Sequence, residues 1–345
     1  MSKYRVGILG ATGTVGQRFC QLLENHPQFE ITALAASDRS VGKAFSEACP
    51  WKLKTPMPAS VSEMEVAPIT PSLDCDIIFS SLPSGVARET EETFARAGYP
   101  VISNSSCYRM EEDVPLLIPE INPEHLALID VQRRKRGFDR GFIITNPNCA
   151  VMSFAPPLAA LDRKFGVKEA IITTFQAVSG AGYPGVASLD ILDNVLPYIP
   201  GEEPKAETEA QKIIGKFSDG SIEKADFTVS AHCFRVNVVD GHTASVRVNL
   251  NETSTLEDVI DAMRSFPSAG LHSSPENFIE VREEPSRPQP RLDRNNGNGM
   301  SITVGRLFPD NIFDYSFVAL SHNTIRGAAG AAILNAELLV EKGIV

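Results

Sequence analysis

The sequence lacks the features that would place the chain in a membrane or an oxidising compartment. No apolar run approaches the ~20 residues needed to span a bilayer. The amino terminus runs directly into an apolar stretch, residues 4–10, without the charged segment and apolar core of a secretory signal. The six cysteines form no CxxC pair and no zinc-type spacing. We therefore expect reduced thiols, no metal site and no membrane partner in a cytoplasmic protein.

Positive charge is also scarce. The chain has 32 Lys and Arg residues against 43 Asp and Glu residues, a formal net charge of −11. A nucleic-acid-binding protein needs a basic face that displaces counterions, so we expect no nucleic-acid partner. The 43% hydrophobic and 22% charged residues are typical of a globular enzyme. A length of 345 residues favours about two domains.

The first half of the chain alternates between strand-like and helix-like segments. Residues 4–10 form an apolar run that ends at a glycine, and the segment after Gly13 has helical spacing of apolar residues. The same order recurs downstream, with strands predicted at 29–37, 75–83 and 99–106 and a helix at 88–98. This alternation predicts a parallel sheet with helices on its faces, a Rossmann-type α/β domain.

The pattern changes near Asn146. A helix is predicted at 146–166, followed by mostly alternating or β-branched strands at 169–179, 226–241, 244–250 and 301–308. These strands predict a mixed or antiparallel sheet, one face of which is solvated or paired to a partner. The remaining segments are an amphipathic helix at 255–266 capped by Thr253 or Ser254, an irregular stretch at 285–294 and a terminal helix at 322–343.

A glycine-rich loop joins the first strand to the first helix. It reads Gly10-Ala-Thr12-Gly13-Thr14-Val15-Gly16, a G-x-x-G-x-x-G variant. Glycines there allow a close approach to a pyrophosphate, and the helix N-terminus supplies N–H donors. Such a motif can also be an ordinary turn, but the strand and helix that flank it favour dinucleotide binding.

The end of the second predicted strand bears on the choice of dinucleotide. It reads Ser37-Asp38-Arg39-Ser40, with Lys43 close behind. Hydroxyl and cationic groups accommodate a 2′-phosphate, whereas an acidic residue would bind the ribose hydroxyl. The segment therefore favours NADP(H), provided that Asp38 points away.

Cys149 is the candidate nucleophile, because it precedes a helix-compatible run. The field at a helix N-terminus favours thiolate and would lower the pKa of Cys149 from about 8.5 toward neutrality. A thiolate adds to an aldehyde, and transfer of hydride to a nicotinamide then leaves a thioester. The alternative is a buried structural cysteine, which is our interpretation of Cys20 and Cys75. Among six histidines, His242 in a predicted turn is the candidate base, although residues alone rank it only slightly above the others.

Several segments taken together resemble the aspartate-semialdehyde dehydrogenases, particularly their archaeal and fungal branch. They are the glycine loop, SNSSCYRM, NPNC, FQAVSGAGYPG, GEEPK, RVxVxDGHT and the terminal HNTIRGAAG. The likeness runs in order from about residue 4 to residue 343. It implies a Rossmann-type domain of residues 1–148 plus 324–345, and a catalytic and dimerisation domain of residues 149–323. It also implies a homodimer or homotetramer.

The resemblance implies a role for each residue at the site. Cys149 would be the nucleophile, His242 the general acid/base, and Gln176 would orient the tetrahedral intermediate. The substrate would be bound by Arg235 at its carboxylate, Glu202 at its ammonium, and Arg109, Lys205 and Asn148 at its phosphate. NADP(H) would be bound by Gly10, Thr12, Gly13, Thr14, Val15, Ser37, Arg39, Ser40, Lys43, Ser81, Gly180 and Asn323. The implied reaction reduces L-aspartyl 4-phosphate to L-aspartate 4-semialdehyde, within the biosynthesis of Lys, Thr, Met and Ile.

Two residues depart from the family pattern and leave alternatives open. Asn237 stands where the family has proline, and Ala244 where it has glutamate. A malonyl-CoA or other acyl-CoA reductase would use the same thioester chemistry without needing Glu202 or Arg109. N-acetylglutamyl-phosphate reductase would lack the free ammonium that Glu202 implies. A non-catalytic NADP-binding homologue is the alternative of another class.

Overall fold

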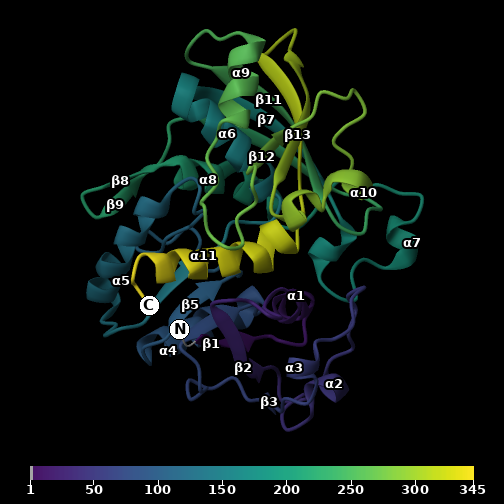
Figure 1. The fold of residues 1–345 in the computed structure, drawn as a ribbon. Coiled ribbons are helices and arrows are strands. Elements are labelled where there is room, and N and C mark those ends of the chain that lie inside the picture. The colour runs from purple at the N-terminus through teal and green to yellow at the C-terminus, as the bar shows by residue number, and fades with distance from the viewer. Residues whose placement is uncertain (1–2) are drawn as a thin grey trace.

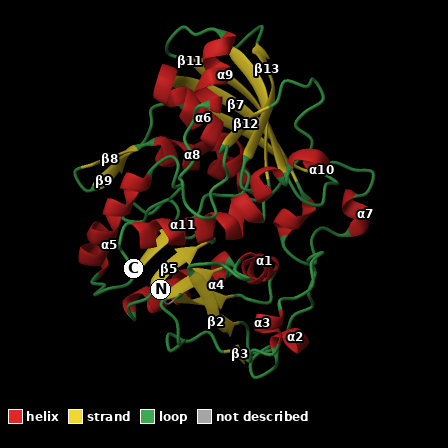
Figure 2. Cartoon of the chain, in the orientation of Figure 1, coloured by secondary structure: helices red, strands yellow, loops and turns green. Residues whose placement is uncertain are grey.

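The computed structural model describes residues 3–345, and its first sheet is built from six strands in the order β3-β2-β1-β4-β5-β6 (Figures 1 and 2). All five neighbouring pairs are parallel. This is the Rossmann strand order, in which ligands bind at the carboxyl ends of the strands beside the central switch point. The strands are β1 (Tyr4–Leu9), β2 (Phe29–Ala35), β3 (Val66–Ala67), β4 (Ile77–Ser80), β5 (Pro100–Ser103) and β6 (Phe142–Thr145).

Helices cover both faces of this sheet. On one face, Phe19 and Ile333 share an apolar cluster with the strand residues Val6 and Phe79. On the other face Phe94 packs in a second cluster. The C-terminal helix therefore packs on the first sheet, and Figure 1 shows it in yellow between the two sheets. The helices are α1 (Thr14–Leu22), α2 (Phe45–Ala48), α3 (Ala59–Ser62), α4 (Ser84–Arg96), η1 (Pro123–Ala127), α5 (Leu128–Arg136) and α11 (Gly330–Glu341).

The second sheet is mixed, with the order β10-β7-β11-β14-β13-β12. Two pairs, β10 with β7 and β12 with β13, are parallel, and the other three are antiparallel. The α/β class with a mixed second sheet is therefore confirmed. The strands are β7 (Val167–Gln176), β10 (Thr228–Arg235), β11 (His242–Leu250), β12 (Ile279–Val281), β13 (Ile302–Pro309) and β14 (Tyr315–Ser321).

Among residues 3–345, helices cover one face of the second sheet. Ile172 and Val246 point into a core shared with helix α6, whereas Ile171 and Phe175 on β7 are 44% and 37% exposed. The alternation along β7 thus separates a buried face from an open one. The further elements of this half are α6 (Val151–Phe165), η2 (Val178–Ala181), α7 (Ser188–Ile191), α8 (Glu202–Ile214), β8 (Lys216–Ser218), β9 (Ser221–Glu223), α9 (Leu256–Arg264), α10 (Pro290–Asp293), η3 (Asn296–Gly299) and η4 (Ile325–Ala329).

Several predicted boundaries were wrong. The second strand ends at Ala35 rather than near residue 37. Helix α9 is capped by Thr255, not by Thr253 or Ser254, because Thr255 and Asp258 form a reciprocal capping box. The stretch predicted to be irregular contains the helical turn α10, which begins with proline at its first position. The terminal helix is preceded by a π-helical turn, η4, which the small-residue pattern did not reveal.

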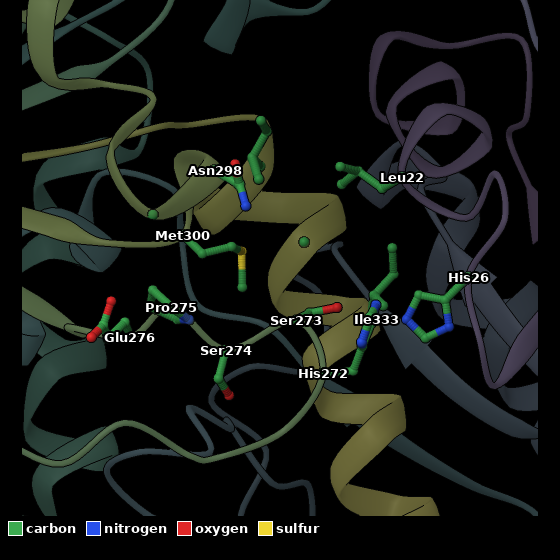
Figure 3. A pocket seen from close by; sticks show the side chains of 13 residues that line it. Leu22, His26, His272, Ser273, Ser274, Pro275, Glu276, Asn298, Met300 and Ile333 are labelled. Atoms are coloured by element: carbon green, nitrogen blue, oxygen red, sulfur yellow. The ribbon is translucent and has the colours of Figure 1, made fainter.

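A pocket of about 440 Å³ lies where the two halves of the chain meet, beside η4 and α11. Figure 3 shows His26, which follows the turn after α1, beside His272 and Ser273 from a loop of the second half. Behind them the buried Glu337 of α11 lies 2.9 Å from His26 Nε2 and accepts the backbone N–H of Ser273, also at 2.9 Å. These bonds fasten the C-terminal helix to both halves. No helix among residues 3–345 has the length and apolar character to cross a membrane.

Candidate active site

Cys149 and His242 meet at the edge where the two domains join. Cys149 lies just before α6, and His242 is the first residue of β11. The Cys149 Sγ atom is 3.2 Å from His242 Nε2, although 93 residues separate them in the chain. The structure therefore brings together the predicted nucleophile and its predicted partner.

The start of α6 is held by the side chain of Asn148. Its Oδ1 atom accepts the backbone N–H groups of Ala150 at 2.8 Å and Val151 at 3.3 Å. A side chain that accepts the first N–H groups of a helix fixes where the helix begins. Asn148 thus holds the backbone next to the nucleophile as well as contributing its amide group to the site.

The hydrogen bonds of His242 determine its tautomer. Its Nδ1 atom accepts the backbone N–H of Ala177 at 3.0 Å, so the proton of the neutral ring is on Nε2, facing Cys149. Burial, reinforced by Arg235, lowers the pKa of His242 to about 3. In this geometry His242 is a neutral hydrogen-bond donor to sulfur. Its orientation comes from a backbone amide and needs no carboxylate.

The electrostatics of Cys149 differ from the sequence-based expectation. Burial is the largest effect and the Glu202 carboxylate the next, and together they raise the pKa of Cys149 to about 12. Arg109, Arg235 and Lys205 act in the opposite direction but do not prevail. The prediction that the helix N-terminus lowers this pKa toward neutrality is therefore wrong for the ligand-free site.

Glu202 anchors one side of the site. It begins α8, is buried, and accepts hydrogen bonds from Lys205 at 2.7 Å, Asn148 at 3.0 Å and Gln176 at 3.2 Å. Burial alone would raise the pKa of this carboxyl group, but the bond and charge of Lys205 with the two amides hold it below its usual value. Glu202 therefore carries a negative charge close to the nucleophile.

The two predicted substrate arginines, Arg109 and Arg235, both act on the charge of Cys149 and keep hydrogen-bond donors available. Arg235, at the end of β10, donates to the Ala177 carbonyl at 2.8 Å. Its guanidinium forms no ion pair with a carboxylate of residues 3–345. Arg109 donates to Glu209 at 3.1 Å and to the Asn104 carbonyl at 2.8 Å. Its Nε atom is buried without a partner among the described residues. Both side chains can therefore still bind an anion.

The glycine loop has the shape that a pyrophosphate requires. Gly10 has φ +77°, and a Cβ atom added to Gly16 would lie 2.4 Å from two carbonyl oxygens of the loop. Helix α1 has no acidic residue in its first turn and no side-chain cap at Gly13. No side-chain cap at Gly13 and no acidic residue of the first turn therefore competes with an anion for the N–H groups there. Ser81 faces the loop and donates its hydroxyl to the Leu9 carbonyl at 2.9 Å.

The other predicted dinucleotide residues fall into two groups, one beyond β2 and one near the nucleophile. Ser37 and Arg39 are exposed beyond β2, Ser40 is buried, and Lys43 donates to the Arg39 carbonyl at 2.8 Å. Toward the nucleophile, Asn323 accepts the Gly241 N–H at 2.8 Å and donates to the Ser179 hydroxyl at 2.8 Å. Gly180 packs on His242, where an added Cβ would lie 2.9 Å from Cε1. Thr12, Thr14 and Val15 complete the loop end.

Sequence reasoning missed three participants. Ala177 orients His242, Glu209 holds both Arg109 and the backbone of Asn148, and Gly327 packs directly on Cys149. Glu209 continues the helical spacing of Glu202 and Lys205, and Ala177 and Gly327 lie in segments that carry the family resemblance, but none of these patterns indicated the contact that the residue makes. The two departures from the family pattern lie apart from the chemistry: Asn237 is exposed between strands and Ala244 is buried in the core.

Comparison with known proteins identifies the family. Residues 5–129 match the semialdehyde dehydrogenase NAD binding domain, and residues 158–326 match the semialdehyde dehydrogenase dimerisation domain. The aspartate-semialdehyde dehydrogenase of Archaeoglobus fulgidus is 52% identical over 99% of this chain and 100% of its own. The chain belongs to the aspartate-semialdehyde dehydrogenase family.

Two crystal structures extend the comparison. The Candida albicans aspartate semialdehyde dehydrogenase with NADP superposes with a TM-score of 0.91, at 42% identity and full coverage of both chains. The Vibrio cholerae aspartate semialdehyde dehydrogenase II complexed with ASA has a TM-score of 0.78 at 26% identity, covering 99% of each chain. The family and the fold predicted from the sequence are confirmed.

Proposed function

We propose that this member of the family reduces L-aspartyl 4-phosphate to L-aspartate 4-semialdehyde with NADPH, reversibly, through a thioester on Cys149. The observation that carries the proposal is the 3.2 Å contact of Cys149 Sγ with His242 inside a ring of opposite charges. An acyl phosphate of aspartate has a carboxylate, an ammonium and a phosphate. These residues supply a partner for each group. Arg235 would bind the carboxylate and Glu202 the ammonium, and the phosphate would be bound by Arg109, Lys205 and Asn148.

The residues act in order along the reaction. Cys149 Sγ attacks the acyl carbon and gives its thiol proton to the departing phosphate, while the bond from carbon to the phosphate oxygen breaks and phosphate leaves with the bonding electrons. Gln176, which lies within hydrogen-bond distance of Glu202, orients the tetrahedral intermediate. When the thioester is reduced and its carbon–sulfur bond breaks, sulfur leaves as thiolate. The Nε2–H of His242 faces that sulfur and stabilises the charge by donating a hydrogen bond.

The residues predicted to bind the dinucleotide support NADPH as the reductant. The loop of Gly10, Thr12, Gly13, Thr14 and Val15 with Ser81 would bind the pyrophosphate, and Ser37, Arg39, Ser40 and Lys43 the 2′-phosphate. Gly180 and Asn323 would hold the nicotinamide near Cys149. When bound, NADPH supplies the hydride for the thioester.

The reverse reaction tests this function. Purified protein is mixed with NADP, phosphate and L-aspartate 4-semialdehyde, and NADPH absorbance is followed. Phosphate-dependent NADPH formation, lost in Cys149→Ser and weaker with NAD, is expected. No turnover by a folded protein that binds NADP would contradict the proposal, and turnover with an acyl-CoA instead would favour the reductase alternative.

We also infer the arrangement of the chain. The boundaries fall at 148/149 and 323/324, because β6 precedes the first junction and η4 follows the second toward α11. The open face of the second sheet, with Ile171 and Phe175, would pair with a second copy in a homodimer or homotetramer. The match to a dimerisation domain supports this. All six cysteines are unpaired, which supports a cytoplasmic location that cell fractionation would test.

A further inference from the structure

Helix α8 presents a stripe of alternating charges to the site. Glu202, Lys205, Glu209 and Lys212 follow one another at spacings of three, four and three residues, which places them on one helix face. The first two belong to the substrate ring described above. The last two are also buried, with Glu209 1% and Lys212 3% exposed. A buried carboxylate and a buried ammonium need partners, and both have them.

Each carboxylate oxygen of Glu209 holds a different part of the site. One oxygen accepts from the Arg109 guanidinium at 3.1 Å. The other accepts the backbone N–H of Asn148 at 2.6 Å. Glu209 therefore links the predicted phosphate-binding cation to the residue that precedes the nucleophile.

Lys212 reinforces the same link through backbone carbonyls. Its ammonium donates to Arg109 at 2.7 Å, Glu111 at 2.7 Å and Val114 at 2.8 Å, which uses all three of its protons. The segment 109–114 lies between β5 and β6 of the first domain, whereas α8 belongs to the second. One helix of the catalytic domain thus holds the Arg109 segment of the other domain at two points.

We propose that Glu209 is a positioning residue that sets the spacing between Arg109 and Cys149. This inference rests on the proposed function, since it concerns where an acyl phosphate is held relative to sulfur. A phosphate bound by Arg109 brings its acyl carbon to the nucleophile only if the guanidinium and the Asn148–Cys149 backbone keep a fixed distance. Misplacement of reacting groups by about 1 Å costs on the order of 10²-fold in rate.

A competing interpretation is that Glu209 only neutralises the charge of Arg109 and does not position it. A carboxylate that merely neutralised Arg109 would weaken phosphate binding, and removing it would strengthen binding without loss of turnover. Two variants separate the interpretations. Glu209→Asp keeps the charge but is one methylene shorter and cannot reach both donors. Glu209→Gln keeps the length but leaves one acceptor oxygen for two donors.

The experiment compares both variants with Glu207→Gln, a control on the same helix that accepts a backbone N–H from Ala231. We expect kcat of the reverse reaction to fall about 10- to 100-fold in both Glu209 variants and to change less than about twofold in the control. NADP affinity, measured by fluorescence, should stay unchanged in all three because the glycine loop is untouched.

A second readout does not depend on the aldehyde substrate. Phosphate should slow the alkylation of Cys149 by iodoacetamide in the wild type, and Glu209→Asp should need several times more phosphate for half-protection. If the wild type shows no turnover, this arm still decides the inference while the proposed function fails separately. If Glu209→Gln does not fold, Glu209→Asp decides. Wild-type kcat in either Glu209 variant, or no phosphate protection in the wild type, would overturn the inference.

Discussion

The nucleophile is the residue whose environment differs most from what its sequence context indicates. Burial and Glu202 raise the pKa of Cys149 to about 12, so the ligand-free thiol is protonated at neutral pH. At pH values below the pKa, the fraction of Cys149 present as thiolate rises about tenfold with each unit of increase in pH. We expect the rate of Cys149 alkylation by iodoacetamide, mapped by mass spectrometry, to rise steadily from pH 7 to pH 10. A rate that is already constant from pH 6 would instead indicate a preformed thiolate–imidazolium pair.

Glu202 affects both the thiol and the substrate, in opposite directions. Replacing it in Glu202→Gln removes a negative charge that raises the pKa of Cys149, so alkylation of the ligand-free protein at pH 8 should be faster. The same change removes the partner of the substrate ammonium, so KM for L-aspartate 4-semialdehyde should rise at least about tenfold. Glu203→Gln, on the same helix but bonded to the Cys233 N–H, is the control. Slower alkylation in Glu202→Gln would be inconsistent with this electrostatic account.

The residues of the site could be predicted where a local motif marks them, but not where only tertiary contacts bring them to the site. Cys149 could be proposed from its place before a helix, whereas His242 stood only slightly above five other histidines. What selects His242 is the register of β11 and the N–H of Ala177, both long-range features. Glu209 continues the helical spacing of Glu202 and Lys205 in the sequence, but this spacing does not reveal that Glu209 is buried, because its burial appears only when the first domain packs on α8.

At the scale of elements, the π-helical turn η4 controls the backbone beside the nucleophile. A Cβ added at Gly327 would lie 2.8 Å from Cys149 Cβ and 3.1 Å from its Cα, too close for either to remain in place. Gly327→Ala should therefore lower kcat about 10²-fold by displacing the nucleophile, with NADP affinity retained. Gly85→Ala, in α4 with open space around it, should leave kcat unchanged. Equal kcat in both variants would show that this contact does not position Cys149.

The sequence predicted the types of the elements in the first half correctly, but it predicted the residues at which elements end less well. The strand–helix alternation gave the parallel sheet because buried parallel strands are continuous apolar runs. The predicted end of β2 lay about two residues too far along the chain. The predicted cap of α9 was one or two residues too early, because a hydroxyl residue precedes this helix at three successive positions, 253–255. Only the reciprocal bonds of Thr255 and Asp258 choose among them. The strand order of either sheet cannot be obtained from local patterns.

In the described part of the chain, one face of the second sheet exposes Ile171 and Phe175, and this is where we expect a second copy. Phe175 stacks on Phe234 with ring centroids 6.0 Å apart on the exposed face of β7 and β10. Phe175→Asp places a charge in that face and should reduce the molar mass measured by light scattering. Ile312→Asp, in an exposed turn between β13 and β14, should not. An unchanged mass in Phe175→Asp would place the interface elsewhere.

The central claim is a covalent thioester on Cys149, and trapping it is the most direct test. The protein is incubated with L-aspartate 4-semialdehyde and NADP without phosphate, quenched in acid and measured by intact-mass spectrometry and peptide mapping. We predict one aspartyl group per chain on Cys149, removed by added phosphate and absent from Cys149→Ser. Turnover with no adduct on Cys149, or an adduct that persists in Cys149→Ser, would contradict the account.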